Sequence, residues 1–158
     1  MKKIKYLVMD VDGTLTDGKI YMGNDGELCK AFNIKDGCGI SNLAIPEGII
    51  PIIITGRKSI ILENRCRELG ITNLHQGISN KIEKLDEILA GEGYDKVAYI
   101  GDDINDLPCM FSVREGGGIV GCPADAVKKV VEIANYVADH NGGDGAVRDF
   151  IEWILESE

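Results

Sequence analysis

Residues 4–14 read Ile4-Lys5-Tyr6-Leu7-Val8-Met9-Asp10-Val11-Asp12-Gly13-Thr14. The stretch that ends at Met9 is short, apolar and rich in aliphatic side chains, which is typical of a buried strand. Two carboxylates, Asp10 and Asp12, follow that strand at once. Ligands of open parallel sheets bind beyond the carboxyl ends of the strands, so these two side chains are the first candidates for a functional site.

The rest of the chain alternates between strand-like and helix-like patterns. Further buried strands are predicted at residues 49–54, 96–100 and 134–138, with a weaker one at Ile119-Val120. Apolar residues at three- and four-residue spacing predict amphipathic helices at 37–44, 59–69, 81–89, 124–131 and 146–155. Such alternation predicts an α/β fold of Rossmann-like, doubly wound type, with a mainly parallel sheet and helices on both of its faces.

One segment, residues 19–34, breaks the alternation. It predicts a β-hairpin around the turn Gly23-Asn24-Asp25-Gly26, which would project after the first strand as a flap. The interval between Asp12 and Thr55 is filled by this hairpin and one helix, and the interval from Thr55 to Lys81 is equally short. No cap domain fits in either place, so we expect a single domain over residues 1–158.

Composition excludes several classes of function. A net charge of −9 repels a phosphate backbone, so we expect no nucleic-acid partner. The five cysteines are scattered and the two histidines lie far apart in the sequence, which argues against a disulfide framework and a histidine metal site. No apolar stretch is long enough for a signal peptide or a membrane span. We therefore expect a cytoplasmic protein with no membrane partner.

Two more motifs follow predicted strands, Thr55-Gly56-Arg57 and Gly101-Asp102-Asp103-Ile104-Asn105-Asp106. An acidic residue at the end of a strand is usually a helix cap or a solvated turn, but that explanation suits three converging clusters poorly. Crowded carboxylates raise each other's pKa and destabilise a fold unless a cation lies among them. The cluster therefore predicts a hard metal ion, and oxygen ligands suit Mg²⁺.

Taken together, Asp10–Thr14, Thr55–Arg57, Lys81 and Gly101–Asp106 resemble the four ordered motifs of the haloacid dehalogenase (HAD) superfamily of phosphohydrolases. The sequence between these motifs resembles that of a small capless branch of the superfamily, which includes 3-deoxy-D-manno-octulosonate 8-phosphate phosphatase. That likeness rests on Ile20-Tyr21-Met22-Gly23, Lys30-Ala31-Phe32-Asn33, Lys35-Asp36-Gly37, Gln76-Gly77, Ser79-Asn80-Lys81 and Gly145-Ala146-Val147-Arg148. The resemblance implies a Mg²⁺-dependent phosphatase that acts on a phosphorylated 2-keto-3-deoxy sugar acid.

The same resemblance implies a role for each catalytic residue. Asp10 would attack phosphorus and form an aspartyl-phosphate. Asp12 would protonate the leaving alkoxide and later deprotonate the attacking water. Thr55 and the backbone of Gly56 would donate hydrogen bonds to the phosphoryl group, and Lys81 would supply a positive charge.

Metal binding is implied for the acidic residues of the first and last motifs. The ligands would be the Asp10 carboxylate, the Asp12 backbone carbonyl and Asp102. Asp106 would either ligate the metal directly or position Lys81 or a metal-bound water. Asp103 is either a further ligand or, as we favour, only the cap of the next helix.

Substrate binding is implied for a further set of residues. Arg57 and Arg65 would grip the carboxylate of the sugar acid, although a solvent-facing helix start and an ordinary ion pair are the plain alternatives. Five residues at the end of the flap would line the substrate site or simply form a cap and turn: Asn33, Ile34, Lys35, Asp36 and Gly37. The tail Gly142–Arg148 is either a helix-entry turn or a segment near the site, with Arg148 as a candidate contact.

A site without a cap has few surfaces that recognise a substrate, and the resemblance implies a homotetramer in which a neighbouring subunit completes each site. Five apolar residues of the flap would suit such an interface: Ile20, Tyr21, Met22, Leu28 and Phe32.

Alternatives remain open at this point. Within the enzyme class, the substrate would instead be a nonulosonate 9-phosphate or a broader range of sugar phosphates; Arg57 favours the octulosonate by resemblance. Outside it, a receiver-type signalling domain also gathers acids, a Thr and a Lys around Mg²⁺ on a doubly wound sheet. A third alternative is a module that binds a sugar phosphate without turnover.

Overall fold

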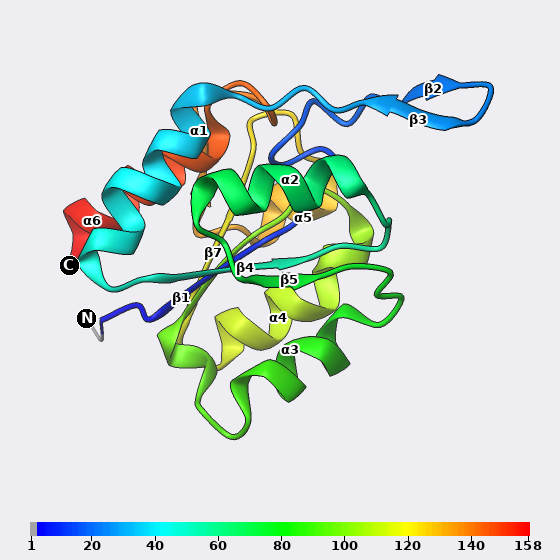
Figure 1. Cartoon of the computed structure of the whole chain (residues 1–158). Helices are drawn as coiled ribbons and strands as arrows, with labels where there is room; N and C mark the ends of the chain where they lie inside the picture. Colours follow the sequence, from blue (N-terminus) through cyan, green and yellow to red (C-terminus); the bar gives the residue numbers. More distant parts are fainter. Residues whose placement is uncertain (1–2) are drawn as a thin grey trace.

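The computed structural model describes residues 3–158 and confirms the predicted α/β fold. A central sheet of six parallel strands has the order β5-β4-β1-β6-β7-β8. The strands are β1 Tyr6–Met9, β4 Ile50–Ile54, β5 Asn73–His75, β6 Val97–Ile100, β7 Ile119–Cys122 and β8 Tyr136–Val137. Because β1 pairs with both β4 and β6, the residues that follow it emerge at the middle of the sheet edge (Figure 1).

Helices cover both faces of the sheet, as predicted (Figure 1). One face carries α1 Ile34–Cys38, α2 Ile60–Leu69 and α6 Ala146–Ser157. The other carries α3 Lys81–Leu89, α4 Leu107–Glu115 and α5 Lys128–Ile133. Helix α1 continues through a π-helical stretch, Gly39–Ala44, and a 3₁₀ turn, Ile45–Glu47; further 3₁₀ turns are Tyr94–Lys96 and Ile104–Asp106. No helix among the described residues is long and apolar enough to cross a membrane.

Two apolar cores lie on either side of the sheet, because successive side chains of a strand point to opposite faces. In β1, Leu7 and Met9 pack with α6 residues such as Phe150, while Val8 packs on the other face with α4 residues such as Met110. All of these side chains are fully buried. The central strands therefore read as continuous apolar runs, which is why they could be predicted from the sequence.

The flap is the hairpin of β2 Tyr21–Gly23 and β3 Gly26–Cys29, which project from the body of the domain as predicted (Figure 1). Gly26, at the turn, has a φ of +118°, a conformation that favours glycine. Met22 and Leu28 are 60% and 68% exposed. After the flap, α1 with its π-helical and 3₁₀ continuation completes the connection from β1 to β4. Helix α2 connects β4 to β5.

Two elements were not predicted, β5 and α4. Strand β5 has three residues, only half-buried, at the edge of the sheet, so it lacks an apolar run. Helix α4 has Pro108 in its first turn, where proline is well tolerated, and that signal marks its start. Helix α5 begins at Lys128 rather than at residue 124, since residues 124–126 form a turn after β7.

Candidate active site

The site lies where the chain changes direction across the sheet. From β1 the chain moves outward to β4 and β5, and it then returns to the opposite side of β1 as β6. The loops after β1 and β6 therefore diverge and leave a crevice at the carboxyl end of the sheet. Asp10 follows β1 directly, and Asp102 lies two residues beyond β6.

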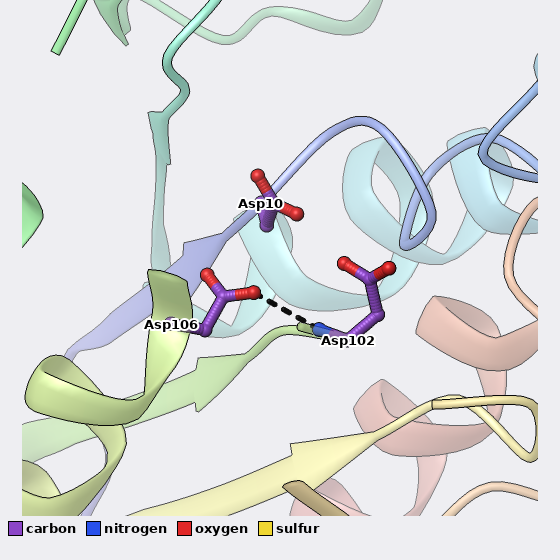
Figure 2. Close-up of side chains that lie close together, drawn as sticks. All are labelled: Asp10, Asp102 and Asp106. Atoms are coloured by element: carbon purple, nitrogen blue, oxygen red, sulfur yellow. Dashed lines mark hydrogen bonds between the residues drawn. The ribbon is translucent and has the colours of Figure 1, made fainter. Parts of the chain in front are cut away.

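Three of the predicted acidic residues meet in this crevice. Figure 2 shows the side chains of Asp10, Asp102 and Asp106 gathered together, and each has an oxygen within 4.8 Å of the others. Asp10 and Asp106 are buried, and Asp102 is half-buried. Burial, and then the Asp10 carboxylate, raise the pKa of Asp102 to about 9. Burial, with the nearby charge of Asp106, raises the pKa of Asp10 as well.

Lys81 provides the positive charge of the cluster. Asn80 caps the N-terminus of α3 through a hydrogen bond from the Glu83 N–H, and this cap places Lys81 at the first helical position. Its Nζ lies 2.8 Å from Asp10 Oδ1 and 3.0 Å from Asp106 Oδ1. Burial disfavours the cation, but the two carboxylates outweigh it and raise the pKa of Lys81. Lys81 is therefore held charged against Asp10.

Asp106 is a positioning group in this structure. Its Oδ1 accepts hydrogen bonds from Lys81 Nζ and from the Tyr99 hydroxyl at 2.6 Å. Its Oδ2 accepts hydrogen bonds from the backbone N–H groups of Asp102 and Asp103, at 3.0 and 3.2 Å. Four donors use the ordinary accepting capacity of a carboxylate, which favours the positioning of Lys81 over direct ligation of a metal.

The crevice opens into a cleft of about 290 Å³, which several of the predicted residues line together. They are Asp10, Asp12, Thr55, Gly56, Arg57, Asp102 and Asp103, and Gly18 and Asn105, which were not predicted, complete the lining. Thr55 is buried, and its backbone N–H donates to the carbonyl of His75 on β5, which fixes the start of the Thr55–Arg57 loop. Arg57 is exposed at the mouth.

The donor set of this cleft fits a hard divalent cation. Carboxylate oxygens of Asp10 and Asp102 are close enough to share one ion, and Thr14 Oγ1 donates to Asp102 Oδ1 at 3.2 Å, which orients that carboxylate. The high pKa of Asp102 reports first the burial of its carboxylate and then its closeness to Asp10, and a bound divalent cation would offset both. The predicted convergence of acids at this edge is thus confirmed.

The structure adds two residues that sequence reasoning missed, Lys30 and Glu27. Lys30 Nζ lies 2.6 Å from Asp12 Oδ1 and 2.9 Å from Glu27 Oε1. Both residues belong to the flap, far from Asp12 in the sequence, and no spacing pattern links them to it. The feature of the sequence that could have identified Lys30 is its place in the family-like stretch Lys30-Ala31-Phe32-Asn33.

Several predicted substrate-binding residues lie outside the cleft of their own chain. Asn33 caps α1 by accepting from the N–H groups of Lys35 and Asp36, and Ile34 and Lys35 are exposed. Gly37 is buried beside Arg65. Arg65 pairs with Glu68 at 3.2 Å and lies over the ring of Phe32 at 5.7 Å, the ordinary ion pair that was the alternative. Whether these residues also bind substrate stays a prediction.

Asp36 faces the N-terminus of α6 instead. Its Oδ1 accepts a hydrogen bond from the Arg148 N–H at 2.9 Å, while its buried Oδ2 has no hydrogen-bond partner among the described residues. Burial raises the pKa of Asp36 to about 6, although backbone N–H groups of α6 partly offset the effect. The carboxylate therefore caps α6 and carries a desolvation cost.

Asp36→Asn should change stability in a pH-dependent way. The folded state holds the Asp36 proton up to about pH 6 and the unfolded state releases it near pH 4, so wild-type stability falls as pH rises through this window. Asn cannot ionise, so the unfolding free energy of the variant relative to wild type should increase from pH 4 to pH 7. Between pH 4 and pH 7 the increase should be about 2 to 2.5 kcal/mol.

Urea unfolding of both proteins at pH 4, 5, 6 and 7 measures this difference. Asp25→Asn in the exposed flap turn is the matched control, because its carboxylate is solvated in both states. A constant difference between Asp36→Asn and wild type across the range would contradict the burial argument.

The remaining candidates take structural positions. Asp103 Oδ1 accepts from the Ile104 N–H at 2.7 Å, the favoured capping role. Gly142 is buried against the loop after Asp10, where a Cβ atom would overlap the Gly13 carbonyl oxygen, so only glycine fits. Arg148 pairs with Glu152 and donates to the Lys35 carbonyl, and it does not line the cleft. The tail thus supports the Asp10–Thr14 loop from outside.

The chain is similar to known proteins in both sequence and structure. No family model matches the chain. The chain is 45% identical over 156 residues to 3-deoxy-D-manno-octulosonate 8-phosphate phosphatase KdsC of Escherichia coli (strain K12), a match that covers 98% of this chain and 80% of that protein.

Solved structures give the same result. A 3-deoxy-D-manno-octulosonate 8-phosphate phosphatase from Moraxella catarrhalis, in complex with a magnesium ion, a phosphate ion and a KDO molecule, has a TM-score of 0.89 and 37% identity, over 98% of this chain and 87% of that one. A HAD superfamily hydrolase (subfamily III A) from Legionella pneumophila has a TM-score of 0.87 and 37% identity, over 99% and 84%. Relatives that are phosphatases remove the support for a receiver domain or a non-catalytic module. This chain therefore belongs to the family of 3-deoxy-D-manno-octulosonate 8-phosphate phosphatases in the HAD superfamily, and it is a phosphatase.

Proposed function

We propose that this chain hydrolyses 3-deoxy-D-manno-octulosonate 8-phosphate to 3-deoxy-D-manno-octulosonate (KDO) and phosphate, by way of an aspartyl-phosphate. The observation that carries the proposal is the buried pair of Asp10 and Lys81 at the head of a cleft, in a chain 45% identical to a phosphatase named for this substrate. The Moraxella catarrhalis relative binds phosphate and KDO together, which are the two products of this reaction.

In this mechanism Asp10 is the nucleophile. Its Oδ1 is held by Lys81, so Oδ2 is the oxygen available to attack phosphorus. The bond between phosphorus and the substrate's 8-oxygen breaks as the new bond forms, and the phosphoryl group transfers to Asp10. Lys81 stays charged and balances the negative charge that collects on the phosphoryl oxygens.

Asp12 is the general acid and base. It lines the cleft two residues after Asp10 and is half-buried. It would give its proton to the departing 8-oxygen and then take a proton from the water that splits the aspartyl-phosphate, which regenerates Asp10. Thr55 and the backbone of Gly56, on the opposite loop, would donate hydrogen bonds to the phosphoryl group.

Mg²⁺ would be held by the Asp10 carboxylate, the Asp12 backbone carbonyl and Asp102, and when bound it neutralises the charge shared by the nucleophile and its anionic substrate. The magnesium ion of the Moraxella catarrhalis complex supports the choice of metal. Asp106 then serves the site through Lys81, by the four hydrogen bonds that its carboxylate accepts.

Arg57, exposed at the mouth of the cleft, would bind the carboxylate of the sugar acid. We further propose that the single cytoplasmic domain assembles as a homotetramer, in which a neighbouring subunit completes each cleft. The exposed flap residues Met22 and Leu28 would contribute to its interface. Ile34 and Lys35, exposed and outside their own cleft, are then available to the cleft of a neighbour, whereas Asp36 and Gly37 are buried.

A substrate comparison tests the proposal. Phosphate release is measured with Mg²⁺ from the octulosonate 8-phosphate, from nonulosonate 9-phosphates and from common hexose phosphates, with Asp10→Asn protein as the blank. We expect kcat/KM for the octulosonate to exceed that of every other substrate by at least about tenfold, since a matched charge and hydroxyl pattern provides a kcal/mol or more of discrimination. A preference for a nine-carbon acid would keep the chemistry and overturn the substrate.

A further inference from the structure

The flap supplies a cation to the acid–base residue. Lys30 follows β3 directly, and its ammonium group is 2.6 Å from Asp12 Oδ1. The Lys30 side chain is only 4% exposed, against 20% for Asp12. A buried ammonium group is stable only when carboxylates pair with it. The contact between Lys30 and Asp12 is therefore a buried ion pair of the site rather than a mobile surface pair.

The same ammonium group ties Asp12 to a second loop of the site. Lys30 Nζ also contacts Glu27 Oε1 at 2.9 Å, and Glu27 Oε2 accepts a hydrogen bond from Ser59 Oγ at 2.7 Å. Ser59 is the cap of α2, the helix that follows the Thr55–Arg57 loop, and it accepts from the Leu62 N–H. A continuous chain of contacts therefore joins Asp12, the flap and the phosphate-binding side of the cleft.

We propose that Lys30 is a positioning residue for the Asp12 carboxylate and that, through Glu27 and Ser59, it makes the placement of the general acid depend on the flap. This inference rests on the proposed function of Asp12. Lys30 occupies Oδ1 of Asp12, so the proton given to the leaving oxygen and the proton taken from water both pass through Oδ2. The flap then has a chemical role as well as a place at a subunit interface.

This role has a signature that a purely structural role lacks. A sugar alkoxide is a poor leaving group and needs a proton from Asp12, whereas p-nitrophenolate leaves without one. Loss of Lys30 should therefore slow the release of the leaving group from the sugar phosphate much more than from p-nitrophenyl phosphate. A residue that only supports the fold, the metal or the nucleophile would slow both substrates equally.

The experiment compares KM and the single-turnover rate of leaving-group release for the two substrates in wild type, Lys30→Met, Lys30→Arg and Glu27→Gln. This rate precedes hydrolysis of the aspartyl-phosphate, in which Asp12 serves both substrates alike. We expect release of KDO from the octulosonate phosphate to slow roughly 10- to 100-fold in Lys30→Met, and release of p-nitrophenolate to slow less than about threefold. Lys30→Arg should recover most of the loss, because it retains the charge and the donor. Glu27→Gln should also slow the octulosonate phosphate more than p-nitrophenyl phosphate, but with a smaller loss than Lys30→Met. Lys84→Met, which removes a lysine paired with Glu87 on α3, is the matched control and should change neither substrate.

Equal losses on both substrates, or a change confined to KM, would overturn the inference. If Lys30→Met does not fold, as judged by its thermal melting, the Glu27→Gln comparison decides by the same ratio. If wild type does not hydrolyse the octulosonate phosphate, the proposed substrate fails, and the ratio is measured with another alkyl phosphate that wild type turns over. The two failures are thereby distinguishable.

Discussion

Asp10→Asn will reduce kcat for phosphate release by at least about 10⁴-fold while leaving the fold intact, because a carboxamide is not a nucleophile at phosphorus. The substitution keeps the size and shape of a side chain that is buried at the end of β1. It also removes one of the negative charges crowded near Asp102 and Asp106, which reduces the like-charge repulsion in the folded state. Phosphate release under single-turnover and steady-state conditions measures the effect.

Two further results bear on this expectation. Asp17→Asn, in the same loop but exposed and outside the cleft, is the matched control and should retain wild-type activity. Acid-quenched wild type should carry covalent phosphate during turnover, and Asp10→Asn should carry none. If Asp10→Asn retained a tenth of wild-type activity with normal melting, another group would be the nucleophile and the aspartyl-phosphate mechanism would be wrong.

The centre of the fold and the acidic cluster could both be predicted from the sequence, for one physical reason. Strands buried on both faces, such as β1 and β6, are apolar throughout, and the polar residues that end them mark the ligand edge. Asp10, Asp102 and Asp106 therefore converge as expected. The helix that begins at Lys81 was also predicted, and the structure adds Asn80 as its cap.

Contacts set only by tertiary packing could not be predicted in this way. Lys30, where the flap returns to the domain, contacts Asp12 across 18 residues of sequence, and no periodicity encodes that contact. Asp36 caps α6 across a separation of 112 residues, so its position looked like that of a loop residue near the substrate. The roles of Lys30 and Asp36 depend on the packing of segments that have no local signature.

Removal of Mg²⁺ should abolish activity and lower stability together. The carboxylates that would bind the ion are also the crowded like charges that destabilise the fold when it is absent. Without a metal ion, burial and then the neighbouring Asp10 hold the pKa of Asp102 at about 9, so the cluster is destabilising when both groups are charged. Saturating Mg²⁺, at about 100 times its dissociation constant, should raise the unfolding free energy by about 2.7 kcal/mol. Chelation should reverse the increase and reduce phosphate release by at least about 10³-fold.

Asp102→Asn separates the metal site from the general effect of salt. The variant retains a neutral oxygen against Thr14 but removes a charge from the ligand set, so its Mg²⁺-induced rise in melting temperature should largely disappear. In metal-free buffer it should melt above wild type, since a crowded carboxyl group has been replaced by a neutral amide. Asp103→Asn, at the next residue, changes an exposed carboxylate that accepts from the Ile104 N–H, and this variant should keep the Mg²⁺ response. An equal Mg²⁺ response in wild type and Asp102→Asn would place the ion elsewhere, because a ligand that carries one of the few charges in the site must contribute to its affinity.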